Sequence, residues 1–242
     1  MTAIDDLERH RAARDQRLRS PEGWLALTSR TILNEGDNGV EGGTASLRNG
    51  EVTLRIGDST HIWPAGVKGP GPFFFHGHKR YEILRQADKT AVRVRDPASP
   101  TLAAYRGLSF YQNDDRFRVD AELTGETKTI ILAVGLGVDV EHTCPGTLAF
   151  SIDDKRYTLD PVVEDGELFI LFRDGTNTKS TYGAGRFLYA PMPDAHGRVL
   201  LDFNKAFNPP CALTEHASCP IAPPQNRLAL DVTAGEKYPL PT

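Results

Sequence analysis

The sequence predicts an all-β protein, mainly an antiparallel barrel or sandwich, with an N-terminal helical arm. Short runs in which apolar and polar residues alternate recur along most of the chain. Glycines separate many of these runs, as turns between short strands require. No long helical pattern follows the N-terminal segment, and many short strands without helices are typical of barrels and sandwiches.

Composition narrows the class of protein. A chain of 242 residues with 39% hydrophobic and 25% charged residues is typical of a soluble protein with one large or two small domains. A net charge of −4 provides no broad basic surface, so we expect no nucleic-acid partner. No apolar run approaches the ~20 residues of a membrane span. The charged N-terminus is unlike a secretory signal, so we expect a cytoplasmic protein without a membrane partner.

The N-terminal segment predicts a helix over residues 3–19. It is rich in Ala, Leu, Glu and Arg and contains neither Gly nor Pro. Ile4, Leu7 and Leu18 form a narrow apolar stripe, which predicts that the helix lies on a surface by one face. Ser20-Pro21 ends it, because the residue before a proline is disfavoured in the α region. The predicted helical arm is residues 1–33.

Residues 34–100 predict a small β-meander or sandwich. Four glycines between residues 36 and 43 indicate a polar loop. Asn49-Gly50 predicts the type I′ turn of a hairpin, because both central positions of that turn need positive φ. The pattern of alternation predicts two further strands, 79–86 and 90–96.

His76 and His78 stand in a loop rich in Gly and Pro. On an extended strand their side chains would point to one side and could share a metal ion. With no acidic residue nearby, a solvated turn is the better interpretation. We therefore predict no metal site there.

Residues 101–242 predict the larger domain, an antiparallel β-barrel-like unit. Asp96–Pro100 contains two prolines and is predicted to be the stiff joint that precedes it. The predicted strands are 117–123, 128–134, 147–153, 156–160, 167–174, 186–191, 198–204 and 227–235.

The segment Tyr182–Arg227 is the predicted functional region. Its prolines fix φ and remove amide donors, which predicts a long, rigid connection. Rigid loops over the mouth of a barrel are common places for small-molecule sites. Strand alternation places Asp202 and Asn204 on one side and Phe203 on the other.

These residues give two kinds of candidate. We predict Asp202 as an acid–base catalyst. Arg186 is either the salt-bridge partner of Asp202 or a clamp for a carboxylate or phosphate. Asp174–Asn177 before it is interpreted as a solvated turn. The predicted ligand-binding residues are Tyr182, Arg186, Asn204, Lys205, Asn208 and Arg227.

The cysteines of this segment allow three interpretations. Cys211, His216 and Cys219 could bind a metal ion with Asp202. Cys211 could instead be a nucleophile with His216 as its base. We favour the third, in which both cysteines pack as small hydrophobic side chains. Three cysteines also argue against a disulfide framework. We therefore predict no metal and no cofactor.

The same segment carries a resemblance. The runs YGAGRFLYAPMP, DFNKAFNPPCA and CPIAPPQNRL, followed by AGE at residues 234–236, resemble a bacterial and archaeal family known only as a domain of unknown function. The resemblance extends over nearly the whole chain and is weakest at residues 40–90. It supports the predicted fold and implies no activity.

The leading functional hypothesis is binding of a small polar or anionic molecule at the mouth of the C-terminal barrel, with acid–base catalysis by Asp202 as an extension. An enzyme and a pure binder both remain open, as does a homo-oligomer. The alternative is a structural or protein-interaction module, in which the Pro-rich loop caps a filled barrel. A polar cavity beside Asp202, Asn204 and Arg186 favours the first, and pairing of these residues only with one another favours the second.

Overall fold

The structure, a computed structural model, describes residues 2–67, 69–70, 73–135 and 137–239. It confirms the predicted class: antiparallel strands dominate, and a helix forms the N-terminal arm. The chain divides into two compact units. The large unit contains Met1–Asp15, Arg106–Ala212 and Ser218–Thr242, and the small unit contains Gln16–Tyr105 and Leu213–Ala217. The division into three regions, residues 1–33, 34–100 and 101–242, stays a prediction.

Helix α1 runs from Ala3 to Arg19, as predicted. Asp5 and Asp6 lie in its first turn and Arg17 and Arg19 in its last, an arrangement that complements the helix dipole. Leu7 and Leu18 are buried, whereas Ile4 is 57% exposed, so the apolar stripe is shorter than predicted.

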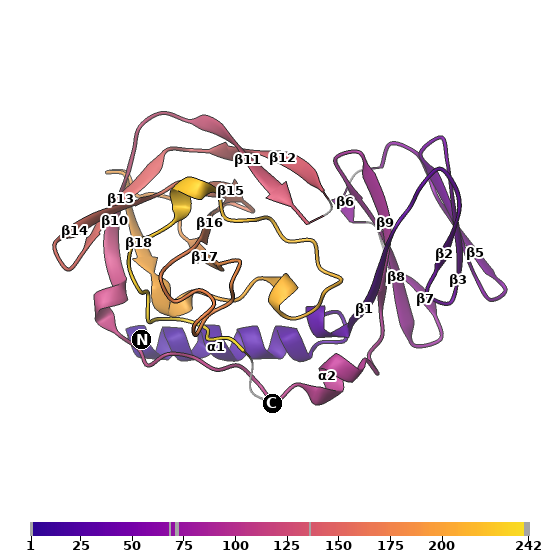
Figure 1. Cartoon of the computed structure of the whole chain (residues 1–242), viewed down its shortest axis with the longest axis horizontal. Coiled ribbons are helices and arrows are strands. Elements are labelled where there is room, and N and C mark those ends of the chain that lie inside the picture. Colours follow the sequence, from indigo (N-terminus) through magenta and orange to yellow (C-terminus); the bar gives the residue numbers. More distant parts are fainter. Residues whose placement is uncertain (1, 68, 71–72, 136, 240–242) are drawn as a thin grey trace. The chain divides into compact units, whose positions relative to one another are not determined.

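The described residues of the large unit form three antiparallel sheets, whose strands are labelled in Figure 1. The four-stranded sheet has the order β14-β13-β10-β18, the three-stranded sheet is β15-β16-β17, and β11 and β12 form a hairpin. The strands are β10 Arg118–Thr124, β11 Lys128–Val134, β12 Val138–Cys144, β13 Thr147–Ile152, β14 Lys155–Leu159, β15 Val162–Glu164, β16 Glu167–Phe172, β17 Arg186–Ala190 and β18 Arg198–Asp202. Short 3₁₀ helices are Asp115–Phe117, Phe203–Lys205, Pro210–Ala212 and Pro224–Asn226.

One hydrophobic core holds the large unit together. The rings of Phe172 and Phe203 meet edge to face, with centroids 5.4 Å apart, and Phe150 lies 5.7 Å from Phe203. Buried aliphatic side chains from β13, β16, β17 and β18 surround these rings, among them Leu148, Ile170, Leu188 and Leu201.

In the small unit, the residues that the structure describes form two antiparallel sheets and a second hydrophobic core. One sheet has the order β2-β3-β4-β5, and the other has the order β1-β9-β8-β6 with β7 also paired to β8. Asn49 and Gly50 both have positive φ in the β3–β4 turn, as the type I′ prediction requires. The elements are the 3₁₀ helix Trp24–Ala26, β1 Leu27–Ile32, β2 Gly36–Val40, β3 Gly43–Arg48, β4 Glu51–Ile56, β5 Ser59–Trp63, β6 Gly69–Pro70, β7 Phe74–His76, β8 Lys79–Gln86, β9 Lys89–Arg95 and α2 Pro100–Ala104.

The predictions for residues 36–40 and 227–235 were wrong. Gly36–Val40, expected within a polar loop, is strand β2, because its backbone pairs with β3 without needing an apolar side-chain pattern. Residues 227–235, expected as a strand, form irregular chain in which backbone carbonyls of Val232 and Ala234 accept hydrogen bonds from a buried arginine. The strands of the described residues pair as separate sheets and not as one closed ring.

Within the part of the chain that the structure describes, no helix has the length and apolar character needed to cross a membrane.

Candidate functional site

Several polar residues of the predicted segment Tyr182–Arg227 belong to a buried hydrogen-bond network, and Arg186 is its central residue. Arg186 opens β17 and is fully buried. Its Nη2 donates to Asp174 Oδ2 and to the Val232 carbonyl, each at 2.8 Å. Its Nη1 donates to the Ala234 carbonyl. The carboxylate partner of Arg186 is thus Asp174, which corrects the predicted pairing with Asp202.

The turn that follows β16 is correspondingly buried, although the sequence suggested a solvated turn. Asp174 is 6% exposed, because its Oδ2 accepts from Arg186 while its Oδ1 accepts from the Thr176 amide at 2.8 Å. Asn177 Oδ1 in turn accepts from the Asp174 amide at 2.8 Å. In this turn Asp174 is the counter-ion of Arg186, and Thr176 and Asn177 hold it in place through hydrogen bonds. A solvated surface turn has the same polar composition, so the sequence alone does not distinguish the two.

Asp202 and Asn204 lie together, as predicted, but not as neighbours on one strand. β18 ends at Asp202, and Phe203–Lys205 form a 3₁₀ turn. Asn204 is 1% exposed, and its Nδ2 donates to Asp202 Oδ1 at 3.0 Å and to the Asp114 carbonyl at 3.1 Å. The Asp202 carboxylate is only partly buried and lies 4.0 Å from Arg118 Nε.

Asn208 and Lys205 contact the helical arm. The Asn208 carbonyl accepts from Arg14 Nη2 at 2.9 Å, and its amide donates to Glu236 Oε2 at 2.8 Å. Arg14 and Glu236 are themselves a buried ion pair, with 3.0 Å between Nε and Oε1. Lys205 Nζ pairs with the carboxylate of Asp6. Both predicted ligand-binding residues therefore contact α1, and Asn208 also contacts Glu236.

Tyr182 and Arg227 lie closer to the surface than Arg186. Tyr182 is half-buried, and its hydroxyl donates to the Cys211 carbonyl at 3.2 Å. Burial and the neighbouring Cys211 raise the pKa of Tyr182 to about 12, so its hydroxyl stays protonated at neutral pH. The Arg227 side chain is exposed, and its backbone bridges Arg173.

The histidines and cysteines do not form a metal centre among the described residues, where no group of three or more candidate ligands gathers. Cys211 and Cys219 both belong to the large unit, whereas His216 belongs to the small unit. His78, in the small unit, lies 3.3 Å from Asp96.

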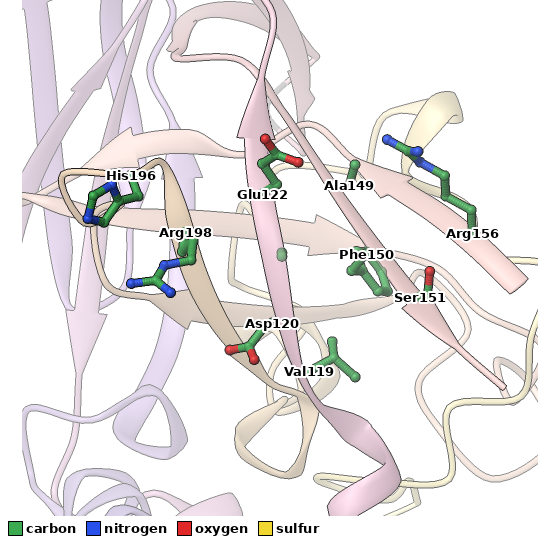
Figure 2. Close-up of a pocket in the computed structure, with 10 residues that line it drawn as sticks. Val119, Asp120, Glu122, Ala149, Phe150, Ser151, Arg156, His196 and Arg198 are labelled. Carbon is green, nitrogen blue, oxygen red and sulfur yellow. The ribbon is translucent and has the colours of Figure 1, made fainter. Parts of the chain in front are cut away.

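A cleft of about 660 Å³ lies in the large unit, on the sheet β14-β13-β10-β18 (Figure 2). Figure 2 shows His196 and Arg198 on one side of β10, and Ser151 and Arg156 on the other. Ten residues line the cleft: Val119, Asp120, Ala121, Glu122, Ala149, Phe150, Ser151, Arg156, His196 and Arg198.

Strand register brings the charged side chains of the cleft together. Glu122 on β10 is paired with Arg198 on β18 and with Ala149 on β13, so a small residue lies beside the carboxylate. Ser151 on β13 is paired with Arg156 on β14. Arg198 donates to Asp194 at 3.0 Å.

The side chains of four cleft residues make no ion pair or side-chain hydrogen bond with any described residue: Asp120, Glu122, Ser151 and Arg156.

The sequence prediction missed this cleft, apart from the fact that His196 and Arg198 fall within the predicted segment. Alternation along residues 118–124 marks Asp120 and Glu122 as side chains on the outer face of a strand. The same pattern is typical of any solvated sheet face. Charges from three segments come together at the cleft only because β10 pairs with β18 and, through β13, lies near β14.

Comparison with known proteins gives a family but no activity. The family model described as "Protein of unknown function (DUF1684)" matches residues 103–237. A solution NMR structure of an uncharacterized protein from gene locus rrnAC0354 of Haloarcula marismortui is 30% identical, with 59% of this chain and 83% of that chain covered and a TM-score of 0.48. No curated protein matches.

Proposed function

We propose a function for a chain that belongs to the DUF1684 family of proteins of unknown function: it binds a small polar molecule with an anionic group in the cleft of the large unit. The observation that supports this proposal is that four polar side chains of the cleft make no ion pair or side-chain hydrogen bond with any described residue. Arg156 offers a planar fork of donors suited to a carboxylate or phosphate. Asp120 and Glu122 offer acceptors for an ammonium or hydroxyl group.

Both signs of charge in one cleft narrow the class of ligand. A dianion that contacts Arg156 would also experience repulsion from Asp120 and Glu122. A zwitterion such as an amino acid would place its carboxylate at Arg156 and its ammonium group at the two carboxylates. We therefore expect zwitterions and hydroxy acids to bind better than compounds with only negative charge. The open sheet face favours modest affinity, because it desolvates its charges only in part.

The proposal describes a binder. Asp202 ends β18 but is not among the residues that line the cleft. Its carboxylate accepts hydrogen bonds from Asn204, so we assign it no step of acid–base chemistry.

For the Pro-rich segment itself, the structural alternative has its own support. Arg186, Asn204 and Asn208 are each at most 1% exposed and bond to groups of the same unit. We propose that this segment stabilises the large unit and binds no ligand through these side chains.

A thermal-shift screen of amino acids, hydroxy acids, simple carboxylates and phosphates tests the proposed function. At about 100 times its dissociation constant, a ligand that binds only the folded protein stabilises it by ~2.7 kcal/mol. We expect zwitterions to raise the melting temperature of wild type and to lose this effect in Arg156→Met. Glu122→Gln should weaken the response to zwitterions more than the response to simple carboxylates.

Lys155→Met is the matched control, because Lys155 is an exposed cation on the same strand outside the cleft. It should respond like wild type. A screen in which no compound stabilises wild type, or in which Arg156→Met responds as strongly as wild type, would overturn the proposal.

A further inference from the structure

Cys211 and Cys219 are close to each other in the large unit, and neither forms a disulfide or lines the cleft. The backbone amide of Cys211 donates to Cys219 Sγ at 3.1 Å. This bond places the Cys219 sulfur directly beside the backbone of Cys211, so the two residues are neighbours in space. Cys211 is partly exposed and Cys219 is buried.

Both cysteines are held by rigid backbone. Cys211 lies in the 3₁₀ turn Pro210–Ala212, and the Ala212 amide donates to the Pro209 carbonyl at 2.9 Å. The Cys219 carbonyl accepts from the Gly135 amide at 3.2 Å, next to a bridge between Val134 and Pro220. The proximity of the sulfurs is therefore built into two fixed segments.

Local chemistry favours a reactive Cys211. The contact with the Cys219 thiol, together with Tyr182, outweighs the opposing effect of burial and lowers the pKa of Cys211 to about 7. A large fraction of Cys211 is then thiolate at neutral pH, and the thiolate is the form that attacks disulfides.

We propose that Cys211 and Cys219 are a redox-active dithiol that exchanges with low-molecular-weight disulfides, Cys211 being the attacking and Cys219 the resolving residue. This inference is independent of the proposed ligand site.

The exchange has two balanced steps. The Cys211 thiolate attacks one sulfur of the small disulfide, a Cys211 mixed disulfide forms, and the other half leaves as a thiolate that takes up a proton. The Cys219 thiol then gives up its proton and attacks Cys211 Sγ, which forms the Cys211–Cys219 disulfide and releases the second small thiol. The two cysteines lose two electrons, and the small disulfide gains them.

Cys144 provides an internal control within the same unit. It is fully buried and donates to the Gly146 carbonyl at 3.0 Å. Burial raises the pKa of Cys144, so it should not react in the folded protein.

The test incubates reduced wild-type protein in mixtures of glutathione and glutathione disulfide, traps free thiols with N-ethylmaleimide and maps them by mass spectrometry. We expect a Cys211–Cys219 cross-link, while Cys144 stays reduced. Cys219→Ser should instead accumulate glutathione on Cys211, and Cys144→Ser should behave like wild type. Glutathione held on Cys211 of wild type without a cross-link, or no reaction at either residue, would overturn the proposal.

A second measurement needs no variant. The rate at which iodoacetamide alkylates Cys211 in wild type should reach half its maximum near pH 7, below the pH of ~8.5 expected for an ordinary cysteine. A midpoint at or above pH 8.5 would contradict an activated thiol.

Discussion

At the scale of single residues, the large unit depends on charges that are buried and paired. Arg186 and Asp174 both have fully buried side chains, 2.8 Å apart. The two Nη groups of Arg186 also donate to the backbone carbonyls of Val232 and Ala234, so one guanidinium joins β17 to the irregular chain at residues 232–234. Its contact with the Phe172 ring, at 5.4 Å, adds a cation–π interaction.

Arg186→Met should therefore destabilise the large unit strongly. It leaves the Asp174 carboxylate buried without its partner, and such losses cost about 3–5 kcal/mol. Arg116→Met is the control, since Arg116 and Asp153 are an exposed pair in the same unit, and exposed pairs contribute about 0–1 kcal/mol. Urea unfolding followed by far-ultraviolet circular dichroism measures both. Equal losses for the two variants would contradict the structural role of Arg186.

Asp160 gives a prediction about pH. Burial by itself raises the pKa of Asp160, but hydrogen bonds from Lys128, Thr147 and Gln225 outweigh it and hold the pKa below its ordinary value. A depressed folded-state pKa contributes stability above the unfolded pKa of ~3.9, and this contribution is lost as pH falls through the folded value.

Asp160→Asn should therefore be less stable than wild type at pH 7, and the difference should shrink as pH falls below about 4. Urea unfolding of wild type and variant at a series of pH values measures this difference in the free energy of unfolding. A difference that is constant with pH, or that grows in acid, would show that the carboxylate charge is not the source of the stability.

The sequence predicted part of this residue-scale picture. It identified Arg186 as either an ion-pair partner or an anion clamp, because the arginine fork suits a carboxylate or a phosphate. It assigned the wrong partner to Arg186. Asp202 lay on a predicted strand, and Asp174 lay in what resembled a surface turn. Only the course of residues 174–186 brings Asp174 to the guanidinium.

At the scale of elements, the glycine before β17 fixes how that strand begins. Gly185 has φ +111°, and a Cβ there would lie 2.5 Å from the Phe172 carbonyl oxygen. Backbone of β16 therefore occupies the space that any side chain would need.

Gly185→Ala should consequently lower the free energy of unfolding by more than about 1 kcal/mol, through strain and displacement of Arg186. Gly183→Ala is the control, because its Cβ would meet only a Thr178 methyl group at 3.1 Å and its φ lies outside the positive range. Urea unfolding measures the free energy of unfolding of both variants. Equal losses would contradict the close contact between residue 185 and the Phe172 carbonyl oxygen.

Elements whose pattern is local were predictable. Helix α1 and strand β11 have their predicted bounds, because helix propensity and alternation are properties of neighbouring residues. The predicted strand at 227–235 was wrong, because its alternation RLALDV serves packing against the core and carbonyl contacts to Arg186 without a ladder. Strand β12, Val138–Cys144, was not predicted, although burial alternates along most of it.

At the scale of the whole molecule, the two units have separate hydrophobic cores. Both tryptophans, Trp24 and Trp63, belong to the small unit, so intrinsic tryptophan fluorescence reports on that unit. Unfolding of the small unit can therefore be followed by fluorescence separately from a loss of stability in the large unit.

We expect Arg186→Met to speed hydrogen exchange in peptides from β16 and β17 while the thermal midpoint seen by tryptophan fluorescence stays at its wild-type value. Because the two cores are separate, destabilising the large unit should leave the small unit folded. A fluorescence midpoint that falls in parallel with the large-unit protection would show that the two units unfold as one.

The cleft depends on the folded large unit, because it forms only when β10, β13, β14 and β18 are assembled in one sheet. The proposed ligand site was not predictable from a segment of sequence, because Glu122, Arg156 and Arg198 come near one another only through strand pairing.

The most direct test of the proposed site is an NMR titration of isotope-labelled protein with the strongest compound from the thermal-shift screen. The account predicts that amide shifts change most at Asp120, Glu122, Ser151 and Arg156, and that Arg156→Met abolishes them. Changes centred instead on Tyr182, Lys205 and Arg227, or no saturable change at the cleft, would contradict it.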